Sequence, residues 1–136
     1  MKSSREVCLK SHKKVLENPL ESLAKSLLKD LSALNIPTDF TLKLRFYSKY
    51  CFGKYDPNSD VIILYVFADK NHCNLYSYEL LLRTLIHECV HRLQWKSETY
   101  VRLKGVMHNA EFYKLFNEYS KLARGLLYLR EVMNSE

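Results

Sequence analysis

The sequence His87-Glu88-Cys89-Val90-His91 places two histidines four residues apart, with a glutamate directly after the first. On a helix this spacing brings both imidazoles to the same side, one turn apart, where they can bind a single zinc ion. The intervening glutamate then lies beside the metal and can act as a general base. We therefore predict that His87 and His91 are metal ligands and that Glu88 is catalytic; the simpler alternative is a solvated outer helix face.

A catalytic zinc site takes three protein ligands and leaves a fourth position for water. The strongest candidate for the third ligand is His108, which opens the last helix that the sequence predicts. Apolar residues follow it at helical spacing, and if helical His108 falls near the centre of their stripe and points inward. The stripe comprises Phe112, Leu115, Phe116, Tyr119, Leu122 and Leu126. We predict that His108 completes a site for one catalytic Zn²⁺ ion.

Glu111 is the competing third ligand. It follows His91 by twenty positions, a separation compatible with the glutamate ligand of thermolysin-type enzymes. However, it lies toward the edge of the apolar stripe, and an acidic residue in the first turn of a helix is also ordinary helix-dipole chemistry. We expect Glu111 to support a ligand rather than to bind the metal itself.

Other residues that can do chemistry receive different interpretations. His12 and His72 have no motif around them, and we interpret both as surface residues. Cys89 lies on the apolar face of its helix and is expected to be a small core residue rather than a ligand. No residue is assigned to stabilising an oxyanion; Tyr100 and Tyr113 are the candidates because they are nearby in the sequence.

The first half of the chain must supply the scaffold. Leucines at helical spacing predict a helix beginning at the Asn18-Pro19 pair, preceded by a weaker helix over residues 5–16. Residues 39–49 alternate as in a half-buried strand, and residues 61–67 are continuously apolar as in a covered strand. The segment between them is dense in turn formers, so we predict a hairpin or an adjacent antiparallel pair. Either strand is a candidate edge for aligning an extended substrate.

The second half carries the chemistry. The pattern predicts a helix over residues 77–95 with Ser77 as its cap, a short strand at 99–103, and a last helix over 109–132. Helices, two or three strands, a helix, a loop and a helix make an α+β fold with a small antiparallel sheet. The length of 136 residues predicts one domain spanning the whole chain.

Composition narrows the class of protein. The chain is 47% hydrophobic and 26% charged, which excludes a disordered or fibrous protein. No apolar run is long enough to span a membrane, no secretory signal is evident, and the cysteines form no paired motif; we therefore expect a cytoplasmic, reducing environment. The net charge of +6, with its excess in residues 1–35 and 77–107, permits nucleic-acid binding. We expect a monomer.

Taken together, these motifs resemble the SprT-like (Spartan-related) zinc metallopeptidase family. The resemblance covers about residues 40–125 and rests on the paired motifs at 87–91 and 108–112, with a weaker match of the lead-in at 52–56 and 61–67. Asn109 stands where the family usually has glycine, and the cysteine zinc ribbon of many bacterial members is missing. Compact forms of this kind resemble those that phages and other mobile elements encode.

The resemblance implies a minimal zincin-like domain that hydrolyses peptide bonds, with DNA-associated proteins among the substrates. In that interpretation His87, His91 and His108 hold the zinc ion and Glu88 moves the proton. The main alternative is a non-catalytic binding or regulatory module in which zinc fastens two helices, with Glu111 or a cysteine as fourth ligand. A metal-free nucleic-acid-binding protein is a third interpretation, and it rests on charge alone.

Overall fold

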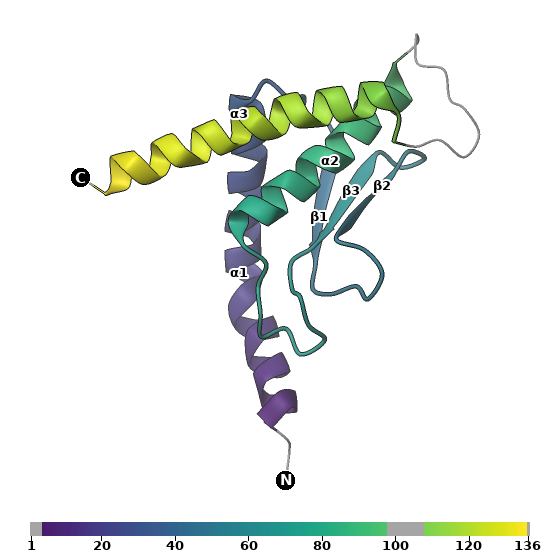
Figure 1. Cartoon of the computed structure of the whole chain (residues 1–136). Helices are drawn as coiled ribbons and strands as arrows, with labels where there is room; N and C mark the ends of the chain where they lie inside the picture. The colour runs from purple at the N-terminus through teal and green to yellow at the C-terminus, as the bar shows by residue number, and fades with distance from the viewer. Residues whose placement is uncertain (1–3, 98–107, 136) are drawn as a thin grey trace.

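The computed structural model describes residues 4–97 and 108–135, with side chains described from residue 19 onward. Three helices and a small three-stranded sheet make up this part of the chain, as predicted for an α+β fold (Figure 1). In chain order the elements are α1 (Ser4–Ala33), β1 (Thr41–Arg45), β2 (Gly53–Asp56), β3 (Val61–Tyr65), α2 (Tyr78–Lys96) and α3 (Ala110–Asn134). No helix in the described ranges is long and apolar enough to cross a membrane.

The sheet is mixed, so the predicted antiparallel sheet is wrong. Its strand order is β1-β3-β2, with β1 parallel and β2 antiparallel to β3. The segment interpreted as a turn contains β2, whose four residues alternate between half-buried and exposed positions. Because β2 forms the hairpin with β3, β1 pairs with the other side of β3. The central position of β3 also excludes residues 61–65 as an edge strand.

A glycine allows the sheet and α2 to lie close together. A Cβ atom on Gly53 would lie 2.9 Å from the carbonyl oxygen of Ile63 and 3.1 Å from the Cγ2 atom of Thr84 on α2. Both distances are too short for unhindered contact, so this position accepts no larger side chain without a shift. The first residue of β2 is therefore held directly against the helix that carries the HExxH motif.

The apolar core lies between the sheet and the helices. Most of its fully buried side chains come from α1, β3, α2 and α3, and two more follow β3 directly: Leu27, Leu31, Ile62, Leu64, Val66, Phe67, Leu82, Leu85, Ile86, Val90 and Phe112. All three helices lie on the same side of the sheet in Figure 1. The opposite face of the sheet carries the exposed side chains of Lys43 and Lys54, which flank Ile63 in register.

The N-terminal region forms one helix where two were predicted. α1 continues through Pro19, so Asn18 does not cap a helix start. The φ angle that proline imposes is itself helical, and the Asn-Pro pair is therefore compatible with a helix interior as well as with a first turn. Sequence alone does not distinguish these two placements.

A buried carboxylate links the three helices. Asp30 on α1 is 4% exposed and accepts a hydrogen bond from the hydroxyl of Tyr78, the first residue of α2. The Arg130 guanidinium on α3 binds both oxygens of the same carboxylate, at 2.7 and 3.2 Å. Although burial opposes ionisation, these two donors and the Arg130 charge keep the pKa of Asp30 below its usual value. The Asp30 carboxylate, with its charge paired and its oxygens hydrogen-bonded, thus links α1, α2 and α3.

Candidate metal centre

The helix α2 carries the HExxH motif on a well-defined scaffold. Ser77 caps it as predicted, and the side-chain oxygen of Ser77 accepts a hydrogen bond from the backbone amide of Leu80. The apolar face of α2 is buried, including Cys89, which is 2% exposed and is confirmed as a core residue. His87 and His91 lie on the other side of the helix, half-buried and one turn apart.

His108 reaches the two histidines of α2 from just outside the last helix. Asn109 is the N-cap of α3, so His108 precedes the helix instead of lying within its first turn. The Asn109 side-chain oxygen accepts hydrogen bonds from the Phe112 amide at 2.9 Å and from Gln94 Nε2 on α2 at 3.2 Å. These partly buried hydrogen bonds tie the start of α3 to α2 and thereby set the position of His108.

The three imidazoles converge through their Nε2 atoms. His108 Nε2 lies 3.1 Å from His91 Nε2 and 3.2 Å from His87 Nε2. Nitrogen ligands at 2.0–2.1 Å from a tetrahedral zinc ion are separated by ~3.3 Å, close to the observed spacing. Among the residues described, these three form a group whose ligand atoms all lie within 4.8 Å of one another.

Burial favours the neutral form of the two histidines on α2, which is the form that binds metal. Burial, followed by the neighbouring histidines, lowers the pKa of His91 to about 4. Burial and the nearby His108 also lower the pKa of His87. Desolvated imidazoles gain little from protonation, so His87 and His91 offer nitrogen lone pairs at neutral pH.

An aromatic side chain supports the cluster from within the core. Phe112 is fully buried, and its ring centroid lies 4.9, 4.5 and 4.8 Å from the rings of His87, His91 and His108, respectively. One ring therefore contacts all three imidazoles and restricts their orientation. The apolar stripe on α3 identified Phe112 as a core residue but gave no indication of this contact.

Glu88 is a buried carboxyl group beside the cluster. Its side chain is 7% exposed, and burial raises its pKa to about 7. A carboxyl group tuned to near neutrality can accept a proton and release it again in the same pH range. The chemistry expected of the HExxH glutamate is therefore matched by the environment of this residue.

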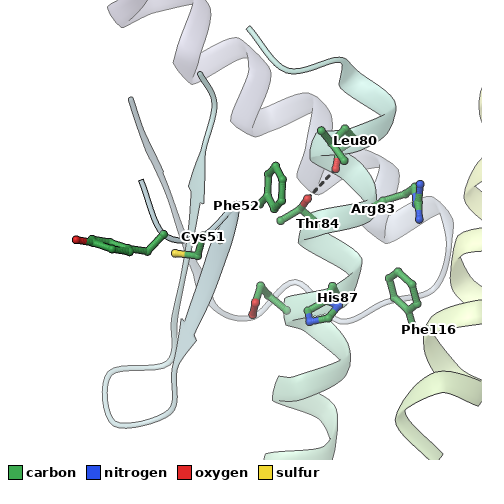
Figure 2. A pocket seen from close by; sticks show the side chains of 10 residues that line it. Cys51, Phe52, Leu80, Arg83, Thr84, His87 and Phe116 are labelled. Atoms are coloured by element: carbon green, nitrogen blue, oxygen red, sulfur yellow. Dashed lines mark hydrogen bonds between the residues drawn. The ribbon is translucent and has the colours of Figure 1, made fainter. Parts of the chain in front are cut away.

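A pocket of about 360 Å³ opens beside His87 and Glu88. Figure 2 shows Cys51 and Phe52 on one side of α2 and Phe116 of α3 on the other. The remaining lining residues are Tyr50, Gly53, Leu80, Arg83 and Thr84. A ligand in this pocket would lie directly against the predicted base and one predicted metal ligand.

The structure also places Glu111 and His72, which the sequence assigned to a supporting position and to the surface. Glu111 is exposed and lies outside the histidine group, although it does occupy the first turn of α3. His72 is not a surface residue: it is 9% exposed and stacks on Phe46 and Phe67 at 4.8 and 5.3 Å. The backbone at this histidine is left-handed, with φ of 56°, and no sequence motif indicates such a turn.

The remaining predictions concern Tyr113, Tyr100 with its strand, and the side chain of His12. Tyr113 is 51% exposed, with its ring centroid 6.1 Å from that of His108. The strand predicted at 99–103, with Tyr100, lies outside the described residues, and so does the side chain of His12.

An ion-pair cluster that sequence reasoning missed holds the other side of α2. Arg92 is 4% exposed, and its Nε and Nη2 atoms donate to the two oxygens of Asp60 at 2.8 and 3.1 Å. Tyr55 on β2 donates to the same carboxylate at 2.9 Å. The Arg92 guanidinium holds the pKa of Asp60 well below its usual range, while burial and Asp60 raise that of Tyr55 to about 12. This cluster fixes α2 against the β2–β3 hairpin.

Comparison with protein-family models, with curated proteins and with solved structures finds no match to this chain. The convergent histidines, the buried glutamate and the pocket beside them are the features of this chain that indicate a function.

Proposed function

We propose that this protein is a zinc-dependent metallopeptidase of the HExxH type, with a minimal zincin-like active site. The observation that carries the proposal is the convergence of three imidazoles, from α2 and from the residue before the α3 cap, at the spacing of zinc ligands. The resemblance of both motifs to the SprT-like family supports the same conclusion. His87, His91 and His108 are assigned as the residues that hold the metal.

The donor set fits zinc better than a hard cation. Imidazole nitrogen suits zinc and other transition metals, whereas magnesium and calcium prefer oxygen ligands. A zinc ion held by His87, His91 and His108 would supply Lewis-acid chemistry and would lower the pKa of a water molecule toward 7. Phe112 orients all three rings, and the hydrogen bond between Gln94 and Asn109 holds His108 in register with α2.

Glu88 is assigned as the group that moves the proton. Its carboxylate accepts a proton from the attacking water and delivers it to the leaving amine nitrogen. Because burial raises the pKa of Glu88 to about 7, proton acceptance and release both occur near neutral pH. Glu88 lines the pocket, so its carboxylate has access to a substrate bound there.

A structural zinc site is the alternative, and it requires a fourth protein ligand. The group that the described chain brings together contains three histidines, and Glu111 and the described cysteines are not part of it. A pocket also adjoins His87, as expected where a substrate must approach. These observations favour the catalytic interpretation.

The substrate is an extended peptide aligned along β2. This strand lies at an edge of the sheet, and its first residue, Gly53, both contacts α2 and lines the pocket. Addition of a peptide to an exposed strand edge satisfies the peptide's backbone groups without sequence preference. β2 is therefore favoured over the opposite edge strand, β1.

Proteins bound to nucleic acid are the proposed substrate class. The sheet face away from the helices carries exposed Lys43, Arg45 and Lys54, in a chain with a net charge of +6. A basic face of this kind attracts the phosphate backbone without reading sequence. Addition of DNA should accelerate cleavage of a DNA-binding protein and leave cleavage of a free peptide unchanged.

The test is a comparison of the wild-type protein with the Glu88→Gln variant. Both should bind one zinc ion per chain by mass spectrometry, since Glu88 is not a ligand in this assignment. The wild-type protein should cleave an unfolded protein substrate, and the variant should be slower by roughly 100-fold or more. Equal cleavage by the two proteins would refute the assigned mechanism.

A further inference from the structure

The pocket beside Glu88 continues along α2 away from the histidine cluster. Its α2 residues recur at helical spacing, so they form a continuous strip on one side of the helix: Leu80, Arg83, Thr84, His87 and Glu88. From the first to the last of these residues the helix rises ~12 Å, which equals the length of three to four extended residues. The pocket is thus long enough for more than the two residues that flank a scissile bond.

The walls of the pocket are apolar and aromatic. Phe52 is 51% exposed on one side, and half-buried Phe116 lies on the other (Figure 2). The Thr84 hydroxyl donates to the Leu80 carbonyl oxygen at 2.9 Å, so the helix backbone already satisfies its polar group. A volume of about 360 Å³ lies within the range of small-ligand pockets. This lining favours a large apolar side chain.

Arg83 adds a positive charge to the same pocket. Its side chain is exposed, and no described residue forms an ion pair with it. The acidic residue in the lining is Glu88, which lies five positions away toward the histidine cluster. A ligand that fills the apolar part can therefore place a carboxylate beside Arg83 at little desolvation cost.

We propose that this pocket selects peptides in which a large apolar residue is followed by a carboxylate, with the apolar side chain between Phe52 and Phe116 and the carboxylate on Arg83. The carboxylate is either an acidic side chain or the free C-terminus of the peptide, since both offer the same two oxygens. The placement of this residue next to the cleaved bond rests on the proposed peptidase function, whereas the binding preference does not.

Binding is measured with metal-free wild-type protein and fluorescent peptides, so that cleavage does not enter. Three peptides with the same blocked, labelled N-terminus end in Phe-Asp-amide, in Phe with a free carboxylate, and in Phe-Asn-amide. The Phe-Asn-amide peptide should bind about threefold to fivefold more weakly than the better of the other two. Which of those two binds more tightly identifies the source of the carboxylate. Replacing Phe by Ala should weaken binding about tenfold.

Two exposed substitutions assign these preferences to the pocket. Phe52→Ala should reduce the advantage of Phe over Ala in the peptide, and Arg83→Glu should abolish the advantage of the carboxylate. Tyr128→Ala and Arg124→Glu are the matched controls, because both residues are exposed on α3 and neither lines the pocket. Both controls should retain the wild-type preferences.

Equal binding of the Phe and Ala peptides, or a carboxylate preference that survives in Arg83→Glu, would overturn the proposal. Its failure is separable from that of the peptidase assignment. Selective binding by a protein that cleaves nothing would support the pocket and refute the peptidase, and cleavage without this preference would do the reverse.

Discussion

Two neighbouring residues on α2 show how differently its two sides are built. Arg92 is buried among fixed counter-charges, with Asp60 bound through two hydrogen bonds and Tyr55 completing the cluster. His91 lies in a group of three histidines, and burial lowers the pKa values of His91 and His87 and raises that of the neighbouring Glu88. On the Arg92 side, the charges and hydrogen-bonding groups have partners within the protein. On the other side, three histidines bring their ring nitrogens together in a group that could hold a metal ion.

The largest expected effect is a loss of stability when the buried Arg92 side chain is removed. Arg92→Ala removes the partner of Asp60 and leaves that carboxylate partly buried, so the free energy of unfolding should fall by about 4 kcal/mol. Lys96→Ala is the control, since Lys96 is 51% exposed and contacts the same carboxylate at 3.4 Å. The control should cost less than about 1 kcal/mol in urea unfolding. Similar losses in the two variants would show that burial is not what makes the Arg92 pair matter.

The next effect distinguishes the two sides by pH. Burial raises the pKa of Glu88 from an ordinary value of 4.5 to about 7, so the folded state binds this proton more tightly than the unfolded state does. Stability should therefore be lost as the pH rises from 4.5 to 7. In metal-free protein, Glu88→Gln should be more stable than wild type by about 3 kcal/mol at pH 8 and equal to it at pH 4. Parallel stability curves would contradict this.

Asp60 should give the opposite pH dependence of stability in the same experiment. Its pKa is lowered in the folded state, chiefly by hydrogen bonds from Arg92, so its contribution is present above the ordinary pKa of about 4 and is lost as the pH falls below that value. Asp60→Asn should therefore be destabilised at pH 7, with a difference from wild type that shrinks in acid. A difference in stability that does not change with pH would show that the charge of Asp60 does not contribute to it.

A third prediction concerns the ligand set. His108→Ala should weaken zinc binding by at least about 100-fold, since loss of a ligand costs more than the 10–100-fold typical of a residue that only supports one. Glu111→Ala should leave the affinity unchanged, because its exposed side chain lies outside the histidine group. Competition with a fluorescent zinc chelator measures both. The reverse ranking would make Glu111 the third ligand.

The smallest effect concerns the link that positions His108. Gln94→Ala removes the hydrogen bond to Asn109 and should weaken zinc binding about tenfold. Asn109→Ser retains a capping hydroxyl for the Phe112 amide but shortens the side chain, so α3 should stay stable while zinc affinity falls similarly. Wild-type affinity in both variants would show that the link does not position the ligand.

The contrast between local and distant information also explains which features the sequence predicts. Ser77 was recognisable as a cap because capping depends on residues within one turn. The spacing of His87 and His91 likewise depends only on helix geometry. Strand pairing is set at a distance, and the pattern of residues 39–67 contains nothing that distinguishes a parallel β1–β3 pair from an antiparallel one.

The contacts that support the site join residues that are far apart in the sequence. Arg92 and Asp60 are 32 positions apart, and Gln94 and Asn109 are 15 apart, so no local pattern connects either pair. His72 was misinterpreted for a related reason: its ring stacks on aromatic rings that precede it in the chain. The sequence thus singled out the three histidines that lie together in the structure, but not most of the residues that surround and support them.

The most direct test of the central claim is a titration of metal-free protein with zinc while cleavage of an unfolded protein substrate is followed. We predict that the cleavage rate rises in proportion to added zinc and reaches a plateau at one equivalent per chain. Binding of one equivalent of zinc with no cleavage at any point of the titration would contradict the assignment of a catalytic metal centre.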